Sequence, residues 1–365
     1  MDATELDRRA DRLDDYLDDA GLEAVWFGRP EAVAWATGGS VATDRAARVG
    51  DAVVGYDGSF TAVSTNAEAD RLRAEELPER ISVETVEWHA ASLAEVIAER
   101  SPTPAAADVD VPGLERVDAS QLRLPLTDGE VDRYRALGRD AAEAVERACR
   151  AVDPDDTERD LAFGVRTLLA ERDVAAPTIL VGGERRAQRY RSPTPTGERV
   201  EGYARVTVVA ERDGLHAPLT RHVAFDPPDS LADDLTRAAQ LEVSALGATR
   251  AVGRFGGDVG SVFDGVEATY EFLDDGDGWR EGPVGGATGY LAAEWTARPD
   301  SDAPVQSPVA CAFGPVVGGA RSQDTVLVAD EGFEVLTRTG EWPTSPVVSW
   351  DYDAAIPRHR VLLVE

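Results

Sequence analysis

The chain has 365 residues, 43% of them hydrophobic, so it is long enough to bury the cores of two domains and too apolar to be disordered. Its 68 acidic and 37 basic residues give a net charge of −31, and every basic residue is an arginine. This charge excludes nucleic acids and anionic membranes as expected partners, because both would repel it.

The first third of the chain predicts a small α/β domain, which we assign to residues 1–120. Residues 4–20 place leucines at helical spacing among charged residues, which indicates a helix. Pro30 begins the next helix, predicted over 30–37, and Asp57-Gly58 predicts a hairpin turn. The remaining elements expected here are strands over 24–27, 51–55, 59–64, 81–86 and 105–109 and helices over 67–73 and 90–100. A proline-containing stretch over 108–126 indicates the boundary.

Residues 121–365 predict a second domain that begins with two long helices. Thr127 and Glu130 form a capping-box pattern for the first helix, and Asp156 or Thr157 caps the second. Asp213-Gly214 predicts the turn of a long hairpin. The other expected elements are strands over 176–183, 308–313, 325–328 and 333–337 and helices over 227–250 and 258–273. This order predicts two related α/β halves around a curved antiparallel sheet.

The absence of lysine together with excess carboxylates resembles the composition of haloarchaeal cytoplasmic proteins, in which high salt screens the repulsion. The sequence has no apolar run of 18 residues and no signal-peptide pattern at its beginning, so we expect a cytoplasmic location. We expect Cys149 and Cys311 to be buried as small hydrophobic residues and not to form a disulfide.

Three segments carry a resemblance to a known superfamily. They are the hairpin with Asp213-Gly214 followed by LTR, the glycine loop GGATGY at 285–290, and GGARSQDTVLV with GFEVLTR at 318–338. In this order and spacing the chain resembles the methionine aminopeptidases, prolidases and creatinase. The resemblance implies an α/β (α+β) architecture, with a creatinase-type N-terminal domain and a C-terminal "pita-bread" domain. It also implies a homodimer.

Active metallopeptidases of this superfamily hold two divalent cations through five side chains. In this sequence the five corresponding positions carry Thr207, Pro218, Tyr290, Gly314 and Gln323. Together these residues supply no carboxylate and no imidazole, whereas a pair of divalent cations needs anionic oxygen ligands. We therefore expect no metal and no other cofactor, and a peptide or small molecule as ligand.

The glycine loop provides two candidate catalytic residues, Tyr290 and Glu294, and the hairpin provides a third, His216. The alternative is that Trp295 of this loop is a core aromatic residue and Glu294 a solvated carboxylate. Arg189 stands where the resemblance implies a substrate-binding histidine. Guanidinium cannot act as an acid or base but can bind a carboxylate through two hydrogen bonds, and an ordinary surface arginine is equally consistent with the sequence.

Arg221, Arg321, Gln323 and Asp324 complete the candidate ligand-binding set. Arg321 and Asp324 flank Gln323, so they either pair with each other across the pocket or merely satisfy each other.

His216 and His222 share strand parity, which would place both on one face of the hairpin. A zinc site there would need a third ligand such as Asp213 or Glu211.

Three functions follow from these patterns. The first is a metal-free, peptidase-like pseudoenzyme that binds a peptide or small molecule, as inactive pita-bread domains do in histone chaperones. The second is a metal-independent, creatinase-like hydrolase of C–N bonds with Glu294 as base and Tyr290, Arg189 or His216 orienting the substrate. The third is an active Xaa-Pro aminopeptidase, which requires ligands at the five positions.

Overall fold

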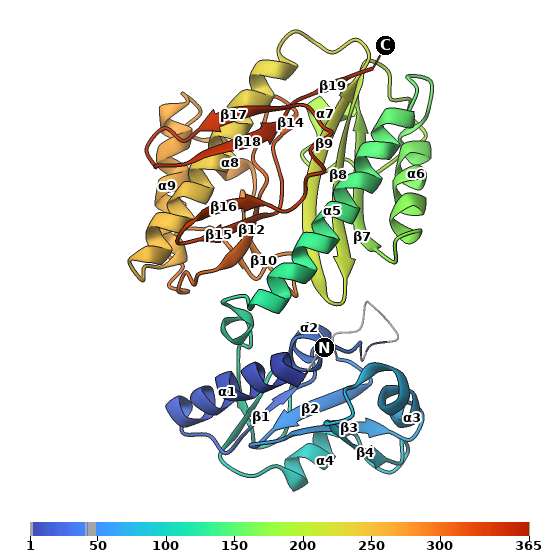
Figure 1. Cartoon of the computed structure of the whole chain (residues 1–365), viewed down its shortest axis with the longest axis vertical. Coiled ribbons are helices and arrows are strands. Elements are labelled where there is room, and N and C mark those ends of the chain that lie inside the picture. Colours follow the sequence, from blue (N-terminus) through green and yellow to red (C-terminus); the bar gives the residue numbers. More distant parts are fainter. Residues whose placement is uncertain (1–2, 41, 43–48, 365) are drawn as a thin grey trace. The chain divides into compact units, whose positions relative to one another are not determined.

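The chain divides into two compact units, residues 1–123 and 124–365, each described below by itself. A computed structural model describes residues 3–40, 42 and 49–364 (Figure 1). None of the helices in these ranges is both long enough and apolar enough to span a bilayer.

The first unit is a mixed six-stranded sheet with the strand order β4-β3-β2-β1-β5-β6. Its strands are β1 (Ala24–Phe27), β2 (Ala52–Tyr56), β3 (Phe60–Thr65), β4 (Ser82–Val86), β5 (Ala105–Ala107) and β6 (Glu115–Arg116). Its helices are α1 (Ala3–Ala20), α2 (Pro30–Thr37), α3 (Ala69–Arg71) and α4 (Leu93–Arg100), and a 3₁₀ turn covers Gln121–Arg123. The helix predicted over 67–73 differs, because α3 has only three residues and continues as a π-helical turn over Leu72–Glu76.

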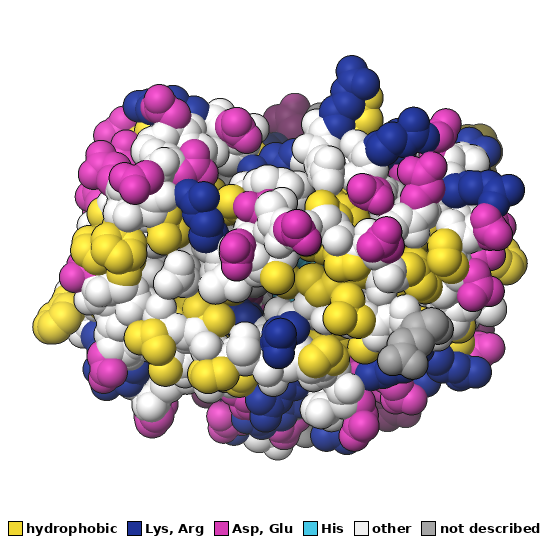
Figure 2. All heavy atoms as spheres, turned by 90° about the horizontal axis from the view of Figure 1, so that it is seen from above, with side chains coloured by type: hydrophobic (Ala, Val, Ile, Leu, Met, Phe, Trp, Pro, Cys, Tyr) yellow, Lys and Arg dark blue, Asp and Glu magenta, His cyan; other side chains and the backbone are white. Residues whose placement is uncertain are grey.

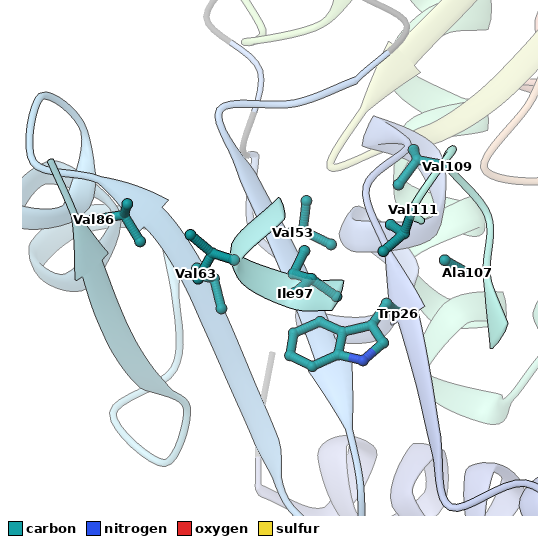
Figure 3. Close-up of a cluster of buried hydrophobic side chains, with 9 residues drawn as sticks. Trp26, Val53, Val63, Val86, Ile97, Ala107, Val109 and Val111 are labelled. Carbon is teal, nitrogen blue, oxygen red and sulfur yellow. The ribbon is translucent and has the colours of Figure 1, made fainter. Parts of the chain in front are cut away.

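A cluster of aliphatic side chains around one tryptophan forms a core of this unit between the sheet and α4 (Figure 3). Trp26 of β1 lies over Gly55 of β2, where a Cβ atom would stand 2.5 Å from the indole ring. Glycine is required there because any side chain would displace the ring. Ser92 and Glu95 form a capping box that begins α4 and directs Ile97 into this core.

The second unit contains the long helices that the sequence predicts. They are α5 (Asp128–Ala151), α6 (Glu158–Ala170), α8 (Leu231–Arg254) and α9 (Val259–Phe272), with a short α7 (Glu184–Arg189) and a 3₁₀ turn over Gly278–Glu281. The capping box of Thr127 with Glu130 is confirmed, and Thr157 is the cap of α6. Cys149 of α5 and Cys311 are buried, as predicted.

Two sheets form the centre of the second unit, whereas the sequence predicts one curved sheet. The first has the order β19-β9-β8-β7, from β7 (Ala175–Gly183), β8 (Tyr203–Arg212), β9 (Leu215–Ala224) and β19 (Leu362–Leu363). The second has the order β11-β10-β12-β15-β16, from β10 (Gly285–Thr288), β11 (Trp295–Thr296), β12 (Val309–Phe313), β15 (Val326–Ala329) and β16 (Gly332–Val335). Helices α5 and α6 lie against the first sheet, α8 lies against the second, and α9 packs against α8 (Figure 1).

The two sheets adjoin along β9. The amide of Thr220 donates to the carbonyl of Gln323 at 2.9 Å, and the amide of His216 donates to the carbonyl of Gly289 at 2.9 Å. The predicted β8–β9 turn is confirmed, since Asp213 and Gly214 both have positive φ, of 53° and 80°. Strand β9 therefore carries residues that can reach both halves of the unit.

Two short hairpins after β12 complete the second unit. They pair β13 (Val316–Val317) with β14 (Ala320–Arg321), and β17 (Thr344–Val348) with β18 (Ala355–His359). β14 lies against α8. The first hairpin places Arg321 beside β9, because the Arg321 amide donates to Nε2 of His222 at 3.3 Å.

Candidate functional site

One face of the β8–β9 hairpin carries most of its polar side chains. Directly opposed residues of an antiparallel pair point to the same side of the sheet. The opposed pairs on this face are Arg205 with His222, Thr207 with Thr220, Val209 with Pro218, and Glu211 with His216. Val206, Val208 and Ala210, at alternate positions of β8, are fully buried.

The middle of this face is a neutral hydrogen-bonded chain. Oγ1 of Thr207 lies 2.8 Å from Oγ1 of Thr220, which in turn donates to Oε1 of Gln323 at 3.2 Å. Thr207 and Gln323, two of the five positions that the resemblance assigns to metal ligands, are thereby brought together through Thr220. Pro218 lies two residues before Thr220 on the same face and offers only its carbonyl, which accepts a hydrogen bond from Thr325.

The guanidinium of Arg321 lies against Gly314. A Cβ atom at Gly314 would stand 2.5 Å from Nη2 and 2.6 Å from Nε of Arg321, and 2.8 Å from Nε2 of Gln323. Gly314 therefore leaves room for this close approach, and a side chain at that position would require Arg321 and Gln323 to move. A cation of the protein occupies the space next to a position aligned with a metal ligand.

The charges of two more arginines lower the pKa of Arg321. Arg205 is 1% exposed and donates to three carbonyls, those of Gly319 at 2.5 Å, Tyr190 at 2.6 Å and Arg191 at 3.0 Å. Burial lowers the pKa of Arg321 to about 9, and the charges of Arg205 and Arg191 add to this shift. Burial likewise lowers the pKa of Arg205 to about 10, with Arg191 again contributing. We call Arg191, Arg205 and Arg321 the arginine cluster.

The sequence did not single out Arg191 or Arg205. Arg205 precedes Thr207 by two residues, so the period of a strand places both on one face, and this signal was present in the sequence. Arg191 has no comparable signal, since it lies in an irregular segment after α7.

The prediction that Arg321 pairs with Asp324 is wrong. Asp324 is 3% exposed and accepts a hydrogen bond from Nη1 of Arg221 at 2.8 Å, and Arg358 lies 3.4 Å away. Burial alone would raise the pKa of Asp324, but the charges of Arg221 and Arg358 hold it well below its usual range. Arg221 and Asp324 thus neutralise each other inside the protein, and neither is open to a ligand.

A second buried carboxylate completes this ionic network. Glu242 of α8 accepts hydrogen bonds from Nη1 of Arg358 at 2.5 Å, from the Asp324 amide at 3.0 Å and from the Ser322 hydroxyl. Burial raises the pKa of Glu242, which the Arg358 charge opposes. The segment 322–324 is therefore fixed to α8 by a carboxylate that is already fully engaged.

Two buried imidazoles stack beside the network. The rings of His222 and His359 have centroids 6.0 Å apart and an interplanar angle of 12°. Burial lowers the pKa of both, that of His222 far below its usual range because His359 and Arg205 add to the shift. Both rings are therefore neutral at pH 7.

The glycine-loop candidates lie in a different place from the arginine cluster. Tyr290 is 1% exposed, and its hydroxyl donates to Oε1 of Glu130 at 2.9 Å and accepts from Nη2 of Arg133 at 2.9 Å. The hydroxyl of Tyr290, a candidate catalytic residue, is thus held by the first turns of α5. The loop closes on itself, since Oε1 of Glu294 accepts the Leu291 amide at 3.2 Å.

His216 belongs to this second group and cannot share a metal with His222. Nδ1 of His216 lies 3.0 Å from the Gly214 carbonyl, and burial lowers the pKa of the ring. Six residues along one strand separate the two histidines by about 20 Å. The zinc alternative for this pair is therefore wrong.

Arg189 is exposed at the end of α7, where its guanidinium lies 5.3 Å from the centroid of the Tyr190 ring. This exposed position is typical of an ordinary surface arginine, which is one of the two interpretations that the sequence allows for Arg189.

The residues at the aligned positions do not fit a pair of divalent cations. They supply hydroxyl, amide and carbonyl groups, and three guanidinium charges act on the same region. Within residues 3–40, 42 and 49–364, no three side chains of His, Cys, Asp or Glu are grouped to hold a metal ion. Cations repel one another, so this arrangement of donors favours an anion.

Comparison with solved structures shows which fold this is. The chain has the α/β fold of prolidases and Xaa-Pro dipeptidases. It is similar to dipeptidase PepE from Mycobacterium ulcerans, with a TM-score of 0.75 and 16% identity over 100% of this chain and 99% of that one. It is similar to the prolidase from Pyrococcus horikoshii OT3, with a TM-score of 0.73 and 15% identity over 91% and 98%.

A further similarity is to a subunit of a larger assembly. The N-terminal domain of the FACT complex subunit SPT16 from chickpea (Cicer arietinum) has a TM-score of 0.67 and 11% identity over 92% of this chain and 97% of that one. No protein-family profile matches the sequence, and no curated protein matches it. At these identities the likeness establishes the fold.

Proposed function

We propose that this protein binds a peptide or small molecule through its prolidase-fold unit and does not hydrolyse peptides with a metal pair. The observation that supports this most directly is the packing of the Arg321 guanidinium against Gly314, beside the neutral chain of Thr207, Thr220 and Gln323. A dinuclear metal site needs anionic oxygens at these places, and a guanidinium charge there would oppose metal binding.

The two enzyme alternatives lack comparable support. An Xaa-Pro aminopeptidase needs the anionic ligands that these positions do not supply. A metal-free hydrolase needs a base aimed at a substrate, and Glu294 instead accepts the amide of its own loop. The binding function is therefore the one that the geometry supports best.

The test uses the full chain purified in high salt. It measures the metal content of the protein and the rate at which the protein hydrolyses Xaa-Pro dipeptides. After washing with a chelator, we expect substoichiometric transition metal by plasma mass spectrometry. We also expect hydrolysis of Xaa-Pro dipeptides with added Mn²⁺ or Co²⁺ to be no faster than a protein-free blank. Stoichiometric retained metal, or metal-dependent hydrolysis, would overturn the proposal.

The resemblance and the composition add three further expectations, which are a homodimer, a cytoplasmic location and solubility in high salt. Acidic side chains and arginines are interspersed over the face of the molecule in Figure 2, with hydrophobic side chains between them. Such a surface stays soluble where salt screens its charges. Light scattering in molar KCl tests the dimer, and a monomer would contradict it.

A further inference from the structure

We propose that a groove along α5 is a binding site for a small anion with two or more phosphate groups in line. The groove has a volume of about 760 Å³ and lies between α5 and residues 334–341, and we call it the α5 groove. Its lining residue Glu146 lies 3.7 Å from Arg221, which points to the opposite face of β9 from Thr220. The α5 groove is therefore separate from the candidate site described above and goes beyond the proposed function.

One wall of the α5 groove is a single face of the helix. Its lining side chains recur every three or four residues, which is the spacing of neighbours on a helix surface. They are Arg135, Arg139, Glu143, Glu146, Arg147 and Arg150. The helix closely approaches the other wall at Gly138, where a Cβ atom would stand 2.5 Å from the carbonyl oxygen of Leu336. Glycine at this position therefore allows the backbones of the two walls to meet.

Contacts at both ends determine how the walls face each other. Arg135 donates to the two carboxylate oxygens of Glu334 at 2.9 and 2.8 Å, and Arg150 donates to the Glu341 carbonyl at 3.0 Å. The hydrogen bond from Arg135 lowers the pKa of Glu334, and the charge of Arg338 adds to this shift, so Arg338 lies near that end of the groove. Along the helix, Arg135 and Arg150 are about 22 Å apart, which is long enough for a chain of several anionic groups.

The α5 groove locally reverses the charge balance of the chain. Five arginines and four glutamates line it, whereas the whole chain has 68 acidic and 37 basic residues. Three of these glutamates are already engaged. Glu334 is held by the hydrogen bonds given above, and Glu146 accepts the Thr339 hydroxyl at 2.6 Å. Glu143 accepts a hydrogen bond at 2.9 Å from Arg172, which is not part of the groove.

Three arginines of the α5 groove remain available. Among the residues that the structure describes, neither Arg139 nor Arg338 forms an ion pair, and both are exposed. Arg147 reaches only Glu171, at 4.0 Å and outside the groove. Arg139 and Arg147 are about 12 Å apart along α5, and Arg338 belongs to the other wall. A linear anion can therefore contact all three guanidinium groups, whereas a single phosphate group cannot.

The charge of the walls favours phosphate over carboxylate groups. Guanidinium binds both through pairs of hydrogen bonds. A ligand must overcome the repulsion of Glu143 and Glu341, which line the same groove. A phosphate group carries about 1.5 to 2 negative charges at pH 7, and a carboxylate carries one, so each phosphate gains more from a nearby arginine. Inorganic triphosphate and the phosphate chain of a nucleotide share this chemistry.

The experiment titrates the full chain in a calorimeter at constant ionic strength and without divalent cations. The probes are tripolyphosphate, inorganic phosphate and citrate. We expect tripolyphosphate to bind at least about tenfold more tightly than either of the other two, since one further charge-assisted hydrogen bond corresponds to about that factor. Absence of tripolyphosphate binding, or equal affinity for phosphate or citrate, would overturn the proposal.

ATP distinguishes the two sources of the phosphate chain. Tighter binding of ATP than of tripolyphosphate would support a nucleotide as the ligand, and equal or weaker binding of ATP would support an inorganic chain. Binding of ATP with no binding of tripolyphosphate would contradict recognition through the phosphate groups.

The variants separate the α5 groove from the charge of the whole chain. Arg139→Met and Arg338→Met should each weaken tripolyphosphate binding about tenfold. Arg166→Met is the matched control, because Arg166 is an exposed arginine of α6 outside the groove. All three variants remove one positive charge, so an equal loss of affinity in all three would assign the binding to net charge and contradict the proposal.

The two groove variants also test the site independently of each other, since their arginines belong to different walls. If one of them lowers the melting temperature without ligand, the other still measures the contribution of the α5 groove to binding. Unchanged affinity in a folded Arg139→Met or Arg338→Met variant would contradict the proposal. Metal retained by the chain would refute the proposed function without affecting this test.

Discussion

Arg221 and Asp324 form a buried ion pair, with Nη1 of the arginine 2.8 Å from Oδ1 of the aspartate and both side chains at most 3% exposed. The arginine also donates to the Thr337 carbonyl at 2.6 Å. The pair joins β9 to the segment before β15, and so holds the two halves of the second unit against each other.

Removing one partner of this pair should be strongly destabilising. Arg221→Met removes the nearer of the two arginines beside Asp324 and the buried arginine beside Glu146, and we expect a loss of about 3–5 kcal/mol in the free energy of unfolding. Unfolding in guanidinium chloride measures this loss of free energy. The control is Arg73→Met, whose partner Asp70 is almost fully exposed and whose loss should cost less than about 1 kcal/mol. Equal losses for the two variants would contradict the buried network.

Local patterns in the sequence predicted most of the elements, because the interactions that form them are local. Thr127 and Glu130 are three residues apart, and Asp213 and Gly214 are adjacent, so each motif can be recognised without the rest of the fold. The hairpin of β17 and β18 was missed for a local reason too. Pro346 and Pro357 oppose each other in it, and proline indicates against a strand.

The site was predicted less well because its contacts join distant residues. Arg221 and Asp324 are 103 positions apart, and Tyr290 and Glu130 are 160. Neighbours in sequence suggested that Arg321 pairs with Asp324, but Asp324 already has two arginines from other strands. A charge count cannot show which arginine remains unpaired, and that choice decides the character of the site.

The hydroxyl of Tyr290 provides a second prediction. Tyr290→Phe removes the donor to Glu130 and the acceptor for Arg133, so we expect a loss of about 1–3 kcal/mol in stability. Tyr290→His should not create metal affinity, because the side chain at this position is directed to α5. Plasma mass spectrometry after incubation with Mn²⁺ or Co²⁺ checks the second variant, and one bound ion per chain would show that the direction is wrong.

Asp108 in the first unit predicts a pH dependence. Burial raises its pKa to about 6, although its Oδ1 accepts the Gly28 amide at 2.7 Å. The folded chain therefore binds a proton that the unfolded chain releases, so Asp108 adds stability below its unfolded pKa and loses it as the pH rises through about 6. The Asp108→Asn variant keeps an acceptor for Gly28 but does not titrate.

We expect the stability of the unmodified chain, relative to Asp108→Asn, to rise by about 1–3 kcal/mol between pH 7 and pH 4. Denaturant unfolding of both proteins at several pH values measures the difference. A constant difference across this range, or one of opposite sign, would show that the carboxyl is ionised in the folded protein.

The net charge of −31 predicts the response of the whole chain to salt. Repulsion between exposed carboxylates opposes folding, and its range falls from about 10 Å in 0.1 M salt to about 3 Å in 1 M salt. We expect the melting temperature to rise steeply between 0.1 and 1 M KCl and then to level off. Replacing KCl by sucrose at equal osmolality is the control, because it stabilises without screening. If sucrose raised the melting temperature as much as the salt, charge screening would not be the cause.

The buried Arg221–Asp324 pair should not share this dependence on salt, since water and ions do not reach it. The Arg221→Met variant should therefore lose the same free energy of unfolding in low and in high salt.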